Sequence, residues 1–173
     1  MYDAVARGSR RFTLGHTWDG APLPCAVGLA VLGALKSEGL VDHVRERGSR
    51  LRDELEDALQ GVDLVGEVRG RGFLLGVEYV DPRDGSSFLP PGLGVAGRID
   101  RAAMELGLIT LSTMPTRDGF AGDQTLFALP LTTSDAELSQ MVERFAETVR
   151  WVARSIEPEL ERRSAAAHRG EDR

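Results

Sequence analysis

The sequence predicts an α/β or α+β protein in which helices pack on one small sheet. Two patterns carry this prediction. In two long segments, apolar residues recur at spacings of three and four, which is the period of a helix with one buried face. In a shorter segment between them, apolar residues alternate with others, which is typical of a strand. After a first apolar helix, the predicted order is helix, strand, helix, strand, strand, helix.

Two helices are predicted in the first third of the chain. Residues 25–35 contain only Ala, Val, Leu and Gly after Cys25, so a helix here has no polar face and is expected to be enclosed by other protein. Over residues 41–59, apolar residues step by three and four with Arg, Glu and Asp between them. This pattern indicates a long amphipathic helix.

A strand is predicted over residues 73–80, where every second residue from Phe73 to Tyr79 is apolar. The sequence VRGRG, residues 68–72, precedes this strand and is rich in glycine. Its glycines do not have the spacing of a phosphate loop, and it leads into a strand rather than a helix. It is therefore interpreted as a tight turn or a bulge.

A helix is predicted over residues 95–106, with Gly107 just past its end. Two strands are predicted after it, over residues 108–114 and 124–131, with a polar loop at 116–122 between them.

The last predicted helix spans residues 134–156 and has an apolar stripe along one face. Ser134 and Glu137 have the spacing of a capping box at its start. Pro158 is predicted to end it, and the charged residues 158–173 are predicted to form a flexible tail.

Composition excludes several classes of function. The 173 residues carry a net charge of −6, which argues against nucleic acid or an anionic membrane as a partner. Cys25 is the only cysteine, so neither an internal disulfide nor a cysteine-rich metal site is expected, and the usage suggests a cytoplasmic protein. The most apolar run, residues 21–35, is too short to span a bilayer and too far along the chain to be a signal peptide.

The sequence predicts no metal site and no catalytic residue of its own. His16, His43 and His168 are scattered along the chain and do not form a ligand set. Ser112 and Ser134 lack the histidine and aspartate pattern of a hydrolase triad.

Residues 15–20 are a candidate phosphate site. Thr17 offers a hydroxyl, and the backbone between Gly15 and Gly20 is free to turn its N–H groups toward an anion. A helix N-terminus follows, and its dipole favours negative charge. The residues alone leave open both this interpretation and an ordinary polar loop before a buried helix.

Three segments carry a resemblance to the class III aminotransferases, which are fold-type I enzymes dependent on pyridoxal phosphate. These are GHTWDGAP followed by AVGLAVLGAL, then GEVRGRGFLLGVEYV, then DGFAGDQTLFALPLTTSDAEL. Together they cover roughly residues 1–156 and resemble the C-terminal portion of the family. The resemblance implies a remnant of the large domain over 1–38, holding the cofactor-phosphate loop and an apolar interface helix. It implies the C-terminal small domain over 39–157, with the tail at 158–173.

The resemblance implies cofactor contacts for two residues. Thr17 takes the place of the threonine that reaches the cofactor phosphate in the partner subunit, and Trp18 stands where the family has a flat aromatic residue. The family's Schiff-base lysine precedes this motif, whereas the only lysine here, Lys36, falls on the apolar helix. Pyridoxal phosphate is therefore expected to bind only together with the N-terminal half that this sequence lacks.

The resemblance also bears on the substrate. Family members that use ornithine or 4-aminobutyrate carry an arginine in the last motif, where this chain has Leu126, and Leu129 replaces the first of two prolines. The branch that acts on ω-amino acids or amines with pyruvate is more similar. Arg117 is a candidate for binding a substrate carboxylate, with a solvated loop charge as the alternative.

The expected function is transamination between an amino donor and an oxo acid, carried out as the C-terminal part of such an enzyme. A non-catalytic partner or regulatory module, or a gene relic that retains the small-domain fold, is the alternative. Because family members are dimers, a homo-oligomer or a complementing N-terminal aminotransferase chain is the expected partner. The first ~35 residues are expected to carry that contact, since an exposed apolar helix usually marks a partner site.

Overall fold

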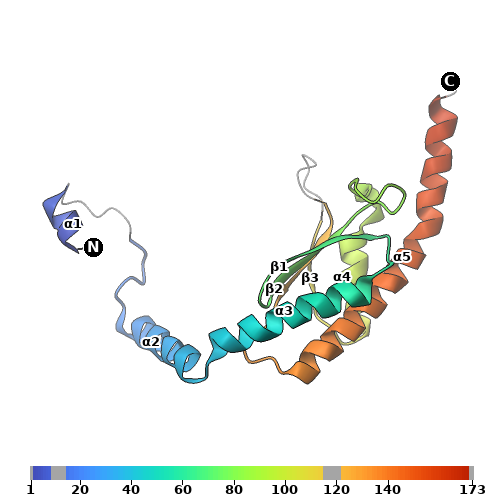
Figure 1. The fold of residues 1–173 in the computed structure, drawn as a ribbon. Helices are drawn as coiled ribbons and strands as arrows, with labels where there is room; N and C mark the ends of the chain where they lie inside the picture. The colour runs from blue at the N-terminus through green and yellow to red at the C-terminus, as the bar shows by residue number, and fades with distance from the viewer. Residues whose placement is uncertain (1, 9–14, 115–121, 172–173) are drawn as a thin grey trace. The chain divides into compact units, whose positions relative to one another are not determined.

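The computed structural model describes residues 2–8, 15–114 and 122–171 of the chain. Its contacts divide the chain into two compact units, Met1–Leu40 and Val41–Arg173 (Figure 1). Each unit is described by itself below.

The first unit holds α1 (Tyr2–Arg7) and α2 (Pro22–Ser37). α2 begins three residues before the predicted helix because proline is well suited to the first turn, where its missing N–H has no partner to lose. It ends before Gly39, which has a φ of +62°. No residue of α2 is buried within this chain. α1 was not predicted, because six residues are too few to show a period.

The second unit is a four-stranded antiparallel sheet with helices packed on one face, as the predicted α+β class requires. The strands lie in the order β1-β2-β4-β3. The elements are α3 (Leu40–Leu59), β1 (Val65–Arg71), β2 (Leu74–Tyr79), the short 3-10 helix η1 (Pro91–Leu93), α4 (Val95–Glu105), β3 (Leu111–Thr113), β4 (Gln124–Ala128) and α5 (Asp135–Glu171).

One hydrophobic core lies between the sheet and the helices. Alternate residues of β2 and β4 point into it, and α3 and α5 contribute stripes at the spacing of three and four. The core includes Leu51 and Leu55 of α3, Leu75, Val77 and Tyr79 of β2, Ile99 of α4, Phe127 of β4, and Phe145, Val149 and Val152 of α5. The opposite face of the sheet is not part of this core.

The glycine-rich sequence before β2 is a hairpin turn, as predicted. Arg71 pairs with Leu74, which leaves Gly72 and Phe73 as the turn residues, and Gly72 has a φ of +60°. The strand before the turn, β1, was not predicted. It is an edge strand in which only Val68 is buried, so its sequence lacks apolar alternation.

The predicted end of the last helix at Pro158 is wrong, and so is the start of a tail there, because α5 continues to Glu171. Contacts beyond the proline hold the helix in place. Leu160 is buried in the core, and Glu159 accepts a hydrogen bond from Arg98 of α4 over 2.7 Å. Burial and this ion pair offset the one helical hydrogen bond that proline removes.

The remaining boundaries agree with the sequence more closely. Ser134 and Glu137 form the predicted capping box: the N–H of Ser134 donates to Glu137 Oε2 over 2.8 Å, and the N–H of Glu137 to Ser134 Oγ over 3.4 Å. β3 and β4 are shorter than predicted. β4 stops at Ala128, two residues before Pro130, because proline cannot donate to a sheet ladder.

Candidate functional site

The turn before α2 carries the two residues predicted to contact a cofactor. The N–H of Asp19 donates to the carbonyl of His16 over 3.0 Å, and the N–H of Ala21 donates to the carbonyl of Trp18 over 3.1 Å. The N–H of His16 in turn donates to Asp19 Oδ2 over 2.8 Å. These three bonds close the turn around Thr17 and leave its side chain on the outside.

Thr17 and Trp18 are both exposed, and 72% of the Trp18 surface is open to solvent. Neither the hydroxyl nor the N–H of Thr17 bonds to another residue in the described ranges. The hydroxyl and the N–H of Thr17 are therefore two neighbouring hydrogen-bond donors, and both can donate to the oxygens of one phosphate group. This turn can therefore hold an anion without losing any of its own bonds.

The N-terminus of α2 contributes less to an anion site than the sequence suggested. Pro22 and Pro24 have no N–H, and the N–H of Cys25 donates to the carbonyl of Ala21 over 3.2 Å. Within the part of the chain that the structure describes, Leu23 alone in the first turn keeps an N–H without an acceptor, whereas an ordinary helix offers several. Most of the donors for a phosphate thus come from the turn, not from the helix.

Lys36 is far from this turn. It lies in the last turn of α2, and the helix rises about 1.5 Å per residue, which places Lys36 about 20 Å along the axis from Pro22. An amine at that distance does not reach a molecule whose phosphate is held at Thr17.

The other polar residues singled out in the sequence do not assemble with the turn. Arg117 lies outside the described residues. His43 Nε2 lies 3.0 Å from the carbonyl oxygen of Thr133, and the His43 ring packs edge-on against Phe73. His43 therefore links α3 to the turn between β1 and β2 and to the loop before α5. No group of three or more metal-ligating side chains occurs within the described ranges. No single helix among these residues is long and apolar enough to cross a membrane.

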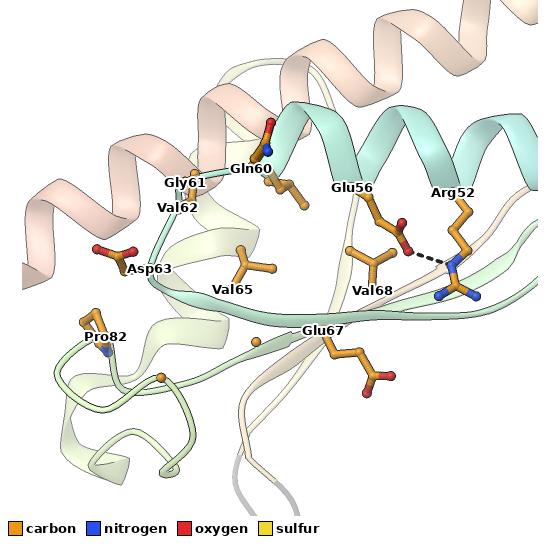
Figure 2. A pocket seen from close by; sticks show the side chains of 13 residues that line it. Arg52, Glu56, Gln60, Gly61, Val62, Asp63, Val65, Glu67, Val68 and Pro82 are labelled. Carbon is orange, nitrogen blue, oxygen red and sulfur yellow. Dashed lines mark hydrogen bonds and ion pairs between the residues drawn. The ribbon is translucent and has the colours of Figure 1, made fainter.

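A cleft of about 550 Å³ lies elsewhere, between the end of α3, β1 and the turn at Pro82 (Figure 2). Its charged residues include Arg52, which donates to Glu56 Oε1 over 2.7 Å, so these charges are already paired. Neither Thr17 nor Trp18, the two candidate cofactor contacts, lines the cleft. It is a surface trough of the second unit.

Two polar features of the sheet were missed in the sequence. Arg69 of β1 donates to Glu78 of β2 over 2.7 Å and to Gln124 of β4 over 3.0 Å, which joins three strands on one face. Asp123, just before β4, accepts the N–H of Ala96 over 2.8 Å at the start of α4. Burial raises the pKa of this carboxyl. The alternation on β2 could have placed Glu78 on the outer face, but no local pattern links Asp123 to Ala96.

A chain of hydroxyls lies on the inner face of the same sheet, with Tyr79 and Thr125 buried and Ser112 partly buried. The Tyr79 hydroxyl and Thr125 Oγ1 are 2.7 Å apart, and Thr125 Oγ1 is 2.7 Å from Ser112 Oγ. Burial raises the pKa of Tyr79, so this hydroxyl stays neutral and serves as a structural partner.

The chain was compared with protein families and with known proteins, and it resembles aminotransferases. The family profile described as Aminotransferase class-III matches residues 1–149. The chain is 30% identical over 156 residues to the uncharacterized aminotransferase YodT of Bacillus subtilis. That match covers 90% of this chain and 35% of YodT. It is 34% identical over 160 residues to the diaminobutyrate–2-oxoglutarate transaminase of Halomonas elongata, covering 90% of this chain and 33% of that protein.

A solved structure gives the same result. The (S)-enantioselective ω-transaminase from Thermomicrobium roseum superposes with a TM-score of 0.72 at 32% identity, over 87% of this chain and 32% of that one. The chain thus spans about a third of the length of the relatives it matches. The profile match includes the turn at Thr17, α2 and the whole sheet. The chain therefore belongs to the class III aminotransferases.

Proposed function

We propose that this chain supplies the C-terminal part of an aminotransferase that uses pyridoxal phosphate to transfer an amino group from an amino donor to an oxo acid. The single observation that carries the proposal is the turn at Thr17. Its hydroxyl and N–H bond to no other described residue, and it lies directly before an apolar helix, in the segment that matches the family.

The described residues fit one end of the cofactor. Thr17 would bind the phosphate through its hydroxyl and N–H, and the exposed ring of Trp18 would lie beside it. Pyridoxal phosphate, when bound, supplies the electron sink that makes a proton removable from the amino donor. The role of Thr17 and Trp18 is to orient the cofactor, and neither moves a proton.

The described residues do not fit the other end. The cofactor must be held by an amine, and Lys36, the only lysine of the sequence, lies about 20 Å from the start of α2. The cofactor and a lysine side chain together cannot span that distance. We therefore propose that the amine comes from the large domain, in preceding sequence or in a second polypeptide.

The substrate proposal rests on two positions. Leu126 is uncharged, so this chain has no arginine at the place where family members specific for ornithine or 4-aminobutyrate carry one. An amine or ω-amino acid as donor and pyruvate as acceptor fit this better. Arg117 remains the candidate for binding the acceptor carboxylate. We further propose a dimer as the working form and the cytoplasm as its location.

A chimaera tests the proposed function. This chain replaces the matching third of the Thermomicrobium roseum transaminase, which then supplies the large domain. We expect the purified chimaera to retain pyridoxal phosphate and to transfer an amino group from an amine to pyruvate. A folded chimaera that retains no cofactor would contradict the proposal and favour a non-catalytic module.

A further inference from the structure

The trough shown in Figure 2 runs along the open edge of β1. The strand order puts β1 at one end of the sheet, so β2 is its only strand partner in the part of the chain that the structure describes. Val65 and Val68 of β1 line the trough together with Leu59 of α3. An edge strand beside a trough with apolar walls is the arrangement at which proteins add a further strand to a sheet.

Two residues of β1 point their backbone groups away from the sheet. In antiparallel strands, the N–H and C=O of successive residues point alternately to the two sides. On β2, the N–H of Tyr79 donates toward the β4 side, and the N–H of Val80 donates to Leu64, on the β1 side, over 2.9 Å. Carried through the register of β1 and β2, this alternation puts the N–H and C=O of Val68 and Gly70 on the open edge. These groups are free to bond to a further strand.

The charges of β1 allow it to pair with itself in one register. Charged side chains at an edge normally oppose strand addition. An antiparallel copy centred on Val68 sets Glu67 of each strand opposite Arg69 of the other. Centring on Glu67 or on Arg69 sets like charges opposite each other, and centring on Gly70 sets Arg69 opposite Arg71. The register centred on Val68 is therefore the one that the charges favour.

The charges on α3 beside the trough have the same symmetry. Arg52 Nε donates to Glu56 Oε1 over 2.7 Å, both side chains are 45% exposed, and Val68 lies below this pair (Figure 2). A two-fold axis through Val68 runs the α3 helices of two copies in opposite directions, so that Arg52 of each faces Glu56 of the other. The remaining N–H groups of Arg52 and the second oxygen of Glu56 are left for that contact.

We propose that β1 pairs antiparallel with β1 of a second copy of this chain, centred on Val68, so that one sheet continues across both copies. Such a two-fold contact is the commonest symmetry among homo-oligomers. The second copy extends the sheet sideways, so the face that carries Leu126 stays uncovered. The contact uses no residue of α2 or of the turn at Thr17. It therefore goes beyond the proposed function and does not depend on cofactor binding.

The test uses the full chain with Leu29→Glu and Leu32→Glu, two exposed positions of α2, to prevent association through that helix. Sedimentation equilibrium gives the dimer dissociation constant, and we expect a dimer in this background. Arg52→Glu sets like charges against each other across the axis, so we expect it to weaken the dimer by about tenfold or more. Adding Glu56→Arg restores opposite charges, and dimerisation should recover.

A second ion pair on the same helix supplies a matched control. Arg50 donates to Glu54 over 2.6 Å, at the same spacing of four residues, but neither residue lines the trough. Arg50→Glu breaks this equivalent pair and makes the same charge change, and we expect no effect on dimerisation. A monomer in the α2 background, or equal effects of Arg50→Glu and Arg52→Glu, would overturn the proposal.

Amide hydrogen exchange, followed by NMR, tests the strand pairing itself. In the α2 background, we expect exchange of the Val68 N–H to slow as the protein concentration rises through the dissociation constant. Ser112 is the control, because the same alternation puts its N–H on the open edge of β3, at the other end of the sheet. Its exchange should stay constant. Exchange at Val68 that does not change with concentration, or equal slowing at both residues, would contradict the proposed pairing.

Discussion

A Cβ atom on Gly48 would lie only 2.4 Å from the Cα of Gly72. Gly48 is buried on α3, and Gly72 forms the turn between β1 and β2. The backbone of the helix therefore touches the backbone of the hairpin, and this contact sets how closely α3 packs on the sheet. A side chain at either position would force the two elements apart.

Gly48→Ala should destabilise the second unit. Alanine gains about 0.5–1 kcal/mol in a helix, but overpacking a tight contact costs about 1–3 kcal/mol, and backbone atoms cannot give way. We expect a lower free energy of unfolding in urea. Gly97→Ala on α4 is the control, because its nearest neighbour is a flexible arginine atom at 3.6 Å. Equal stability of the two variants would show that α3 can shift.

Asp123 should hold the start of α4 through its hydrogen bond from Ala96. Asp123→Ala leaves a buried N–H without an acceptor, which costs about 1–3 kcal/mol. Asp123→Asn keeps an acceptor oxygen and should cost less. Urea unfolding at neutral pH compares the two, and equal losses would mean that the hydrogen bond is not the cause.

The same residue predicts a pH dependence. Burial raises the pKa of Asp123 in the folded chain above its ordinary value of 3.8. A raised pKa means that the folded state binds the proton more tightly, so the stabilisation is complete below pH 3.8 and is lost as the pH rises through the folded pKa. The stability of the natural chain relative to Asp123→Asn should fall over that interval. A constant difference would contradict the assignment.

Asp84 should titrate at an unusually low pH. The hydroxyl and N–H of Ser87, followed by the N–H of Ser86, lower the pKa of this carboxyl to about 2. Because the folded pKa is depressed, the turn at Asp84 should loosen as the pH falls from 3.8 through 2. NMR of the side-chain carboxyl measures this. Ser87→Ala should raise the pKa, and Ser86→Ala should raise it less.

Thr17 should retain the cofactor in the chimaera. A hydrogen bond to a charged group contributes about 1.5–3 kcal/mol, so Thr17→Ala should weaken the binding of pyridoxal phosphate by tenfold or more. Thr17→Ser keeps the hydroxyl and should bind nearly as well. Equal dissociation constants for the three proteins, measured by fluorescence quenching, would remove Thr17 from the site.

The sequence predicted the helices and the strand whose buried side chains recur at a regular spacing. α3, α4, β2 and the start of α5 all followed from apolar spacing and capping residues, and the family motifs identified the candidate turn at Thr17. β1 could not be predicted because an edge strand with one buried residue, Val68, has no alternation. The continuation of α5 past Pro158 depends on contacts with α4, which are distant in sequence.

The polar contacts were harder to predict for the same reason. Asp123 and Ala96 are 27 residues apart, and nothing local to either residue indicates the other. The weak donor set at the start of α2 was readable in principle, because Pro22 and Pro24 visibly lack N–H groups.

Borohydride reduction followed by peptide mapping tests most directly whether the amine comes from outside this chain. The full chain and the chimaera are each incubated with pyridoxal phosphate, reduced and digested. We predict a covalent label on a lysine of the large domain in the chimaera, and none at Lys36 in the chain alone beyond the level of a denatured control. Specific labelling of Lys36 together with transamination by the chain alone would contradict the account.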